Sequence, residues 1–153
     1  MKPKVLASGA MIAALYAALT IVLAPISYGP VQFRVSEALT LLPWYLPEAV
    51  PGLFIGCVVA NFFGGYGAVD IIFGSLATLI GALLTRRASR LGMAAVPPVV
   101  SNMLIIGTML HILIDAPLAA TALYVGLGEA GACFLLGIPL MKILERRGVL
   151  TRR

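Results

Sequence analysis

Charged side chains are scarce in this sequence. Of its 153 residues, 11% are charged and 61% are hydrophobic, and the mean hydropathy is +1.04. A soluble domain carries about 25% charged residues, so this chain cannot cover a water-facing surface with polar side chains. The composition therefore predicts a single membrane domain, residues 1–153, whose solvent is lipid.

Motifs for chemistry are also missing. The sequence has no Gly-rich Walker-type loop, so we do not expect the chain alone to hydrolyse ATP. Cys57 and Cys133 stand apart in apolar stretches and form no CxxC pair. His111 and Asp115 are spaced for one helix face but supply too few ligands for a metal ion. With no nucleophile–base pair or paired carboxylates, the sequence predicts no enzyme, no metal and no cofactor.

The apolar stretches predict an all-α integral membrane protein with six transmembrane helices. A helix needs about 20 apolar residues to cross a bilayer. The second apolar segment, about residues 36–50, is short and holds Pro43 and Pro47, so we expect a kinked or broken helix. Irregular backbone at membrane depth is tolerated only where protein or a cavity satisfies it. The six predicted spans are about residues 5–24, 36–50, 52–63, 69–85, 93–114 and 118–141.

The basic residues predict the orientation. A net charge of +5 is compatible with nucleic-acid binding, but the sequence contains no module that supports it. With six spans, ten of the eleven Lys and Arg residues fall on one side, and only Arg34 falls on the other. Basic residues favour the cytoplasmic side, so we expect cytoplasmic N- and C-termini in a multi-pass protein of the cell membrane.

Arg34 and Glu37 begin a polar site within this apolar chain. A spacing of three residues places both on one face of a helix. They lie near a hydrophobic boundary, where a charge is costly unless it is paired, hydrated or used for binding. One interpretation is that they only pair with each other; the other is that they contact a ligand.

Glu129 is the strongest single signal for binding. It lies near the middle of the last predicted span, where a carboxylate costs about 2.5–3.5 kcal/mol. A bound ligand would explain that cost, and so would a structural hydrogen bond or ion pair. Asn61, Asp70 and Asn102 are further candidates, although Asp70 also suits a helix N-terminus and Asn102 also suits a helix–helix hydrogen bond.

Small residues line the first span. Gly9, Ala13 and Ala17 recur every four residues, with Ala10 and Ala14 one position further on. This spacing lets another helix approach closely, although alanine is common in membrane helices in general.

Several blocks of the sequence together resemble the QueT family of membrane proteins. The first block, residues 25–43, contains Gln32-Phe-Arg-Val-Ser-Glu37. The others follow in the family's order over nearly the whole chain: residues 51–61, residues 70–78, Pro97-Pro98 with Asn102, and Val125-Gly-Leu-Gly-Glu129.

The resemblance implies a substrate-binding S component of an energy-coupling factor (ECF) transporter for queuosine precursors, which are 7-deazaguanines. It implies a six-helix fold, a transmembrane T protein and two cytoplasmic ATPases as partners. Substrate would contact some of Arg34, Glu37, Asn61, Asp70, Asn102 and Glu129. The first helix of such proteins meets the T protein through small residues, which here correspond to Gly9, Ala10, Ala13, Ala14 and Ala17.

A stand-alone secondary transporter is the alternative. In it, Glu129 or Glu37 would carry a proton and the substrate would be a small planar solute. The sequence shows no inverted repeat of the kind common in such transporters. This favours the ECF substrate-binding subunit over the stand-alone transporter.

Overall fold

The computed structural model describes residues 3–29, 31–64 and 66–151. Lys2, Pro30, Arg152 and Arg153, which the sequence analysis used, lie outside these ranges. The structure is 82% helix and has no strand among its described residues. The prediction of an all-α chain is therefore confirmed.

Within the described ranges, four helical stretches have the length and composition to cross a membrane. They are α1 (Pro3–Val22), α4 (Gly67–Arg86), α5 (Leu91–Ala94) continued by α6 (Val96–Ile114), and α7 (Leu118–Ala130) continued by η2 (Gly131–Gly137) and α8 (Ile138–Arg146). The 14 residues of α3 (Ala49–Phe62) cover about 21 Å at 1.5 Å per residue. That length is short of the hydrocarbon core, which is about 30 Å thick.

The six-span prediction is wrong for the second segment. Residues Val35–Trp44 form η1, a 3-10 helix of ten residues, in which every side chain from Ser36 to Pro43 is buried. A 3-10 helix rises about 2.0 Å per residue, so η1 reaches only about 20 Å. Pro43 lies inside η1 and Pro47 follows it. The segment is apolar, as the prediction assumed, but its residues form a helix enclosed by the rest of the protein and not a span that faces lipid.

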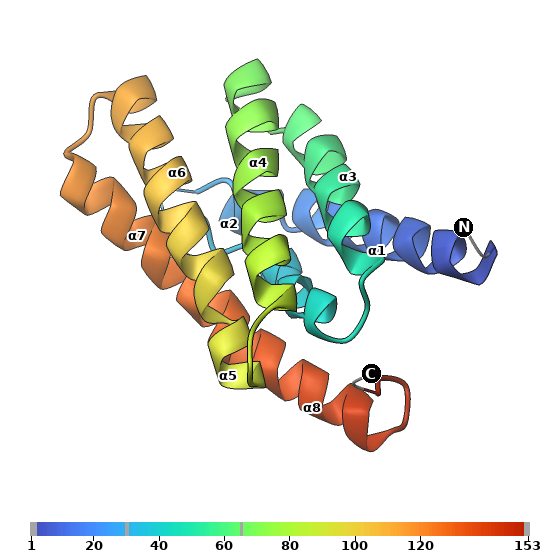
Figure 1. Ribbon diagram of the computed structural model, residues 1–153. Helices are drawn as coiled ribbons and strands as arrows, with labels where there is room; N and C mark the ends of the chain where they lie inside the picture. The colour runs from blue at the N-terminus through green and yellow to red at the C-terminus, as the bar shows by residue number, and fades with distance from the viewer. Residues whose placement is uncertain (1–2, 30, 65, 152–153) are drawn as a thin grey trace.

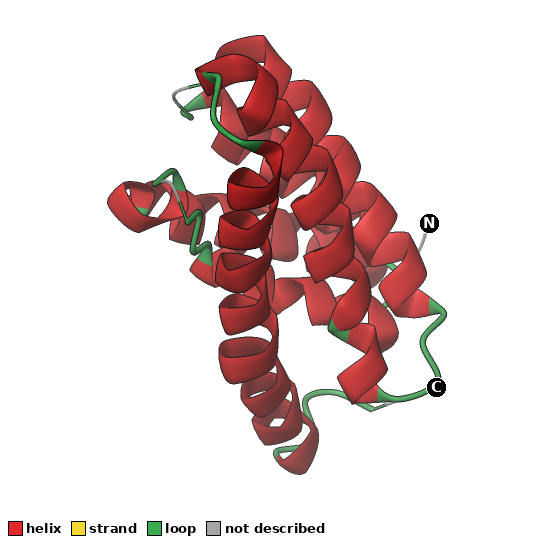
Figure 2. Cartoon of the chain, turned by 90° about the vertical axis from the view of Figure 1, so that its left-hand side faces the viewer, coloured by secondary structure: helices red, strands yellow, loops and turns green. Residues whose placement is uncertain are grey.

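The helices form a wall around η1 (Figure 1). Neighbours along this wall are α1 and α3, α3 and α4, α4 and α6, and α6 and α7. The short η1 packs against α1, α4 and η2, so it lies where the two ends of the wall meet. Figure 2, turned by 90°, shows the same helical layers with only short loops between them.

Glycines permit the tightest helix contacts. A Cβ atom on Gly52 of α3 would lie 2.6 Å from the Gly9 carbonyl oxygen of α1. A Cβ atom on Gly107 of α6 would lie 2.6 Å from the Ala122 Cα atom of α7. Since real Cβ contacts are longer, both helix pairs depend on the missing side chain to approach so closely.

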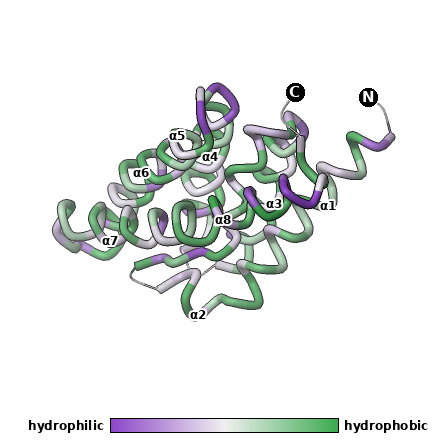
Figure 3. The backbone as a smooth tube through the Cα atoms, turned by 90° about the horizontal axis from the view of Figure 1, so that it is seen from below, coloured by the Kyte–Doolittle hydropathy of each residue, from purple (hydrophilic) through white to green (hydrophobic). Residues whose placement is uncertain are grey.

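The connections between the helices lie at two opposite ends of the bundle (Figure 1). In Figure 1 the α4–α5 connection and α8 lie at the lower end, whereas the α3–α4 and α6–α7 connections lie at the upper end. Figure 3 shows a short hydrophilic stretch at the α4–α5 connection, and most of the helical path is hydrophobic. The Arg86–Arg90 cluster and the basic residues of α8 therefore share one end.

Candidate binding site

Arg34 is the buried cation of the site. It precedes η1 and is 2% exposed. Its Nη2 atom lies 3.7 Å from Asp70 Oδ2, its Nε atom donates to the Ser27 carbonyl over 3.4 Å, and its guanidinium carbon lies 5.3 Å from the Tyr28 ring centroid. The ion pair thus joins the N-terminus of η1 to the first turn of α4. It does not join Arg34 to Glu37, as one interpretation of the sequence had it.

Glu37 is fully buried on η1. Its Oε1 atom accepts a hydrogen bond from the Tyr16 hydroxyl of α1, which is also fully buried. A second bridge between the same elements joins Thr20 Oγ1 and Ser36 Oγ over 2.6 Å. These contacts fix the side chain of Glu37, while its Oε2 atom has no hydrogen-bond partner among the described residues.

Asn61 and Asp70 bring α3 and α4 into the site. Asn61 Nδ2 donates to the Asp70 carbonyl over 2.9 Å and approaches Cys57 Sγ at 3.4 Å. A Cβ atom at Gly74 would lie 2.4 Å from Asn61 Nδ2, so only glycine leaves room for this amide. Tyr28 Oη donates to the Ala60 carbonyl over 2.5 Å, which ties the loop before η1 to the same end of α3.

Glu129 lies on α7, close enough to Glu37 of η1 for their charges to interact. It is 2% exposed. One turn further on, Cys133 Sγ lies 3.7 Å from the Glu37 carbonyl oxygen. One residue earlier, a Cβ atom on Gly128 would lie 2.2 Å from the Val31 carbonyl oxygen. The backbone before η1 therefore rests directly on α7 at Gly128, the residue before Glu129.

These side chains leave polar atoms unused. Nine buried side-chain atoms have no hydrogen-bond partner among the described residues: Ser27 Oγ, Gln32 Nε2, Arg34 Nη2, Glu37 Oε2, Asn61 Oδ1, Asp70 Oδ1 and Oδ2, Ser75 Oγ and Glu129 Oε2. Buried polar atoms are nearly always paired, and an unpaired one costs about 1–3 kcal/mol. Six of the nine belong to the residues just described, so the unpaired buried atoms concentrate in the region around η1.

Contacts join Arg34 to Asp70 and Asp70 to Asn61. Glu37 and Glu129 lie close enough to each other and to Arg34 for their charges to interact. Five of the six predicted binding residues therefore lie in one region. Asn102 is separate. It is 3% exposed, and its Nδ2 atom donates to the Pro98 carbonyl of its own helix over 3.2 Å. No hydrogen bond of the described residues joins Asn102 to the other five, which leaves helix packing as its simplest role.

Sequence reasoning missed Tyr16, Tyr28 and Gln32. Tyr16 and Thr20 are four residues apart within an otherwise apolar span, and that spacing was the available signal for a polar face. Gln32 is 2% exposed and has a φ of 48°, a backbone angle that non-glycine residues rarely adopt. Nothing in the sequence predicts that angle.

His111 has a local role. Its Nδ1 atom lies 2.6 Å from the Ala116 carbonyl oxygen in the α6–α7 connection. Within the described ranges, no three His, Cys, Asp or Glu side chains come together in a way that could hold a metal ion.

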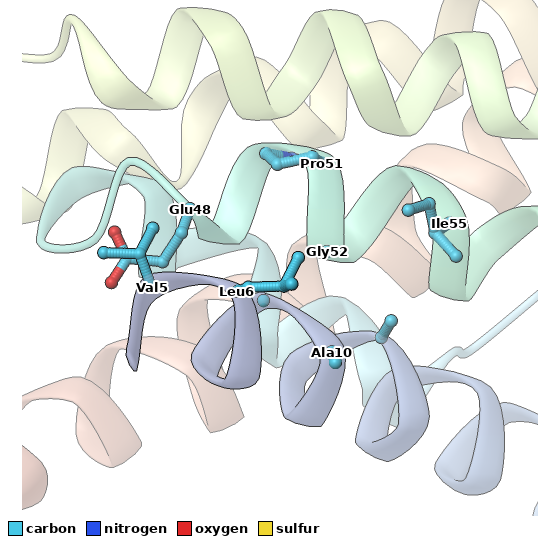
Figure 4. A pocket seen from close by; sticks show the side chains of 9 residues that line it. Val5, Leu6, Ala10, Glu48, Pro51, Gly52 and Ile55 are labelled. Carbon is cyan, nitrogen blue, oxygen red and sulfur yellow. The ribbon is translucent and has the colours of Figure 1, made fainter. Parts of the chain in front are cut away.

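A separate groove runs between α1 and α3 (Figure 4). It encloses about 360 Å³, and its wall is apolar except for Glu48. Gly9 and Ala13 line it from α1, and their helix face packs against Gly52 and Gly56 of α3. Ala17 is buried and Gly9 and Ala13 are half-buried, whereas Ala10 and Ala14 are exposed. The predicted small-residue surface is therefore divided between an internal helix contact and an outer face.

Long apolar helices around an enclosed set of unpaired polar groups are typical of a membrane protein that handles a polar solute. A transporter or its binding subunit is the class that this combination indicates.

The chain belongs to the QueT transporter family, whose model matches residues 6–146. The resemblance found in the sequence is thereby confirmed. A relative from Lactococcus lactis subsp. cremoris (strain MG1363), named "Queuosine precursor transporter QueT", is 44% identical over 73 residues. That match covers 46% of this chain and 43% of the relative, so it spans less than half of the relative's length. No solved structure matches the chain significantly.

Proposed function

We propose that this chain is the membrane-embedded substrate-binding subunit of an ECF-type importer for a queuosine precursor, a 7-deazaguanine. The observation that carries the proposal is the set of unpaired buried atoms on Arg34, Glu37, Asn61, Asp70 and Glu129, in a chain of the QueT transporter family. Membership of a transporter family also fits a protein that is not an enzyme.

The unpaired atoms complement a guanine-like base. Outside the Arg34–Asp70 ion pair, four of them are acceptors: one each on Glu37, Asn61, Asp70 and Glu129. One is an amide donor, Gln32 Nε2. A 7-deazaguanine offers several N–H donors and only two strong acceptors, its carbonyl oxygen and one ring nitrogen. Matched groups of this kind select a ligand far better than an apolar pocket does.

Glu129 is the best group to read the base's N–H edge. The ring N–H and the adjacent amino group of a guanine point the same way, and one carboxylate accepts from both. No described residue donates a hydrogen bond to the Glu129 carboxyl group, and its Oε2 atom is buried without a partner. Its side chain is therefore free to meet both donors.

The energising partners would be a T protein and two cytoplasmic ATPases. The absence of a Walker-type loop from the sequence supports an external source of energy. The exposed Ala10 and Ala14 of α1 provide a small-residue face for the T protein, since Gly9, Ala13 and Ala17 are turned toward the chain's own helices. The basic cluster at the lower end of Figure 1 supports cytoplasmic N- and C-termini.

Uptake of a labelled precursor tests this function. Cells that lack other routes would express the chain with or without the T protein and ATPases, and accumulation of 7-aminomethyl- and 7-cyano-7-deazaguanine would be measured. Accumulation only with the complete set, insensitive to collapse of the proton gradient, supports the proposal. Uptake by the chain alone that stops when the gradient collapses would establish the secondary transporter instead. Uptake of thiamine or riboflavin but of no deazaguanine would refute the substrate.

A further inference from the structure

The carboxyl groups of the site outnumber its cations. Glu37, Asp70 and Glu129 are each at most 2% exposed, and Arg34 is the one buried basic side chain among the described residues. The other described Lys and Arg side chains are exposed, and His111 bonds to Ala116 in a connection. None of these is placed to neutralise the site.

The single cation is already engaged. Arg34 Nη2 lies 3.7 Å from Asp70 Oδ2, and its other contacts are the Ser27 carbonyl and the Tyr28 ring. The remaining carboxyl groups, Glu37 and Glu129, come from η1 and α7 and have no ion-pair partner among the described residues. The Glu37 carboxyl group contacts the neutral Tyr16 hydroxyl, and the Cys133 thiol lies 3.7 Å from the Glu37 backbone carbonyl. The positive charge near enough to act on both carboxyl groups is that of Arg34, which is paired with Asp70.

We infer that the missing cation is part of the ligand: the site selects a 7-deazaguanine whose 7-substituent carries a protonated amine over one whose substituent is neutral. This inference rests on the proposed function and refines it. An alkyl amine is protonated at pH 7, as the side chain of lysine is. A buried carboxyl pair that lacks a counter-ion gains far more from such a group than from a neutral arm of the same shape.

Glu37 and Glu129 bind different parts of the ligand. Glu37 is fixed by the Tyr16 hydroxyl on one oxygen and keeps Oε2 unpaired. One oxygen is enough to accept from an ammonium group, which is compact and has three donors. Glu129 accepts no hydrogen bond from a described residue and meets the two-donor edge of the base. Glu37 is therefore the specificity-determining residue for the charged arm.

Equilibrium binding to the purified full chain tests the inference. The probes are 7-aminomethyl-7-deazaguanine, which is cationic, and 7-cyano-7-deazaguanine, which is neutral. In the wild type the aminomethyl base should bind at least about tenfold more tightly. Glu37→Gln should remove most of that preference while binding of the cyano base is retained, and Glu129→Gln should weaken both bases. Glu48→Gln, a carboxyl change in the separate α1–α3 groove, should alter neither.

Each outcome decides one question. Equal or tighter binding of the cyano base by the wild type overturns the inference and leaves the proposed function intact. A preference that persists in Glu37→Gln overturns the role of Glu37. Binding of neither base by a wild type that is folded, as judged by its thermal transition, overturns the proposed function and the inference with it. Should Glu37→Gln fold poorly, Tyr16→Phe, which releases the same carboxyl group, should reduce the preference in the same direction.

Discussion

At the scale of single residues, the central feature is a polar set that is buried before any ligand arrives. Arg34 and Asp70 form an ion pair at 3.7 Å between side chains that are almost fully enclosed. Burying two charges costs several kcal/mol for each ion, and their attraction repays it only with good geometry. The pair is therefore poor evidence for stability by itself, and its retention in an apolar chain fits a role in binding.

Removing one partner of this pair should be costly. Arg34→Met leaves the Asp70 carboxyl group buried without a cation, and we expect a loss of about 3–5 kcal/mol in the free energy of unfolding. Adding Asp70→Asn should recover a large part of that loss, because the uncompensated charge disappears. Thermal unfolding of the ligand-free protein in detergent measures both. If the double variant were as unstable as Arg34→Met, or less stable, the ion pair would not be the cause.

Some of these residues were predictable and others were not. A charge in an apolar span is visible in a sequence, and this led directly to Arg34, Glu37, Asp70 and Glu129. Their pairing was not visible, because Asp70 reaches Arg34 across 36 positions of the chain. Nor could periodicity predict the turn at Gln32, whose positive φ depends on how its segment rests on α7.

At the scale of elements, hydropathy found every apolar segment but misjudged one of them. It predicted a span at residues 36–50, where the structure has the enclosed η1 and then the start of α3. Hydropathy measures whether a segment avoids water. A segment buried in protein and a segment in lipid are equally hydrophobic, so hydropathy does not distinguish them. The prolines and the polar residues Ser36, Glu37 and Thr40 were the local signs that this segment lies inside the bundle.

Helix contacts made through glycine give an element-scale prediction. Gly107→Val should push α6 from α7, because even a Cβ atom at Gly107 would lie 2.6 Å from Ala122 Cα. Overpacking of this kind costs about 1–3 kcal/mol, seen as a lower unfolding temperature in detergent. Gly92→Ala is the matched control, since a Cβ atom there meets nothing within 4 Å. Equal unfolding temperatures for the two variants would show that the α6–α7 contact is looser than the structure has it.

At the scale of the whole molecule, the two ends of the bundle differ in charge. The α4–α5 connection and α8 bring the internal arginine cluster and the basic residues of α8 to one end (Figure 1). At the other end in Figure 1, α3 terminates at Phe62 and Phe63, which are 73% and 64% exposed. A basic end and an aromatic end are what a membrane protein with a fixed orientation presents.

Cysteine labelling tests that orientation. Ser89→Cys in the α4–α5 connection should react with a membrane-impermeant maleimide only after the cells are opened, and Phe63→Cys at the opposite end should react in intact cells. Both native cysteines are buried, so the unmodified chain provides the background. The reverse pattern would place the basic end outside and contradict cytoplasmic termini.

The most direct test of the binding site is the affinity of the purified chain for 7-aminomethyl-7-deazaguanine, measured side by side for the wild type, Glu129→Gln and Glu48→Gln. We predict tight binding by the wild type and by Glu48→Gln. Affinity should fall at least about 30-fold in Glu129→Gln, since losing a charged hydrogen-bond partner costs about 2 kcal/mol or more. Unchanged affinity in a folded Glu129→Gln variant would contradict the assignment of this buried cluster as the place where the base is recognised.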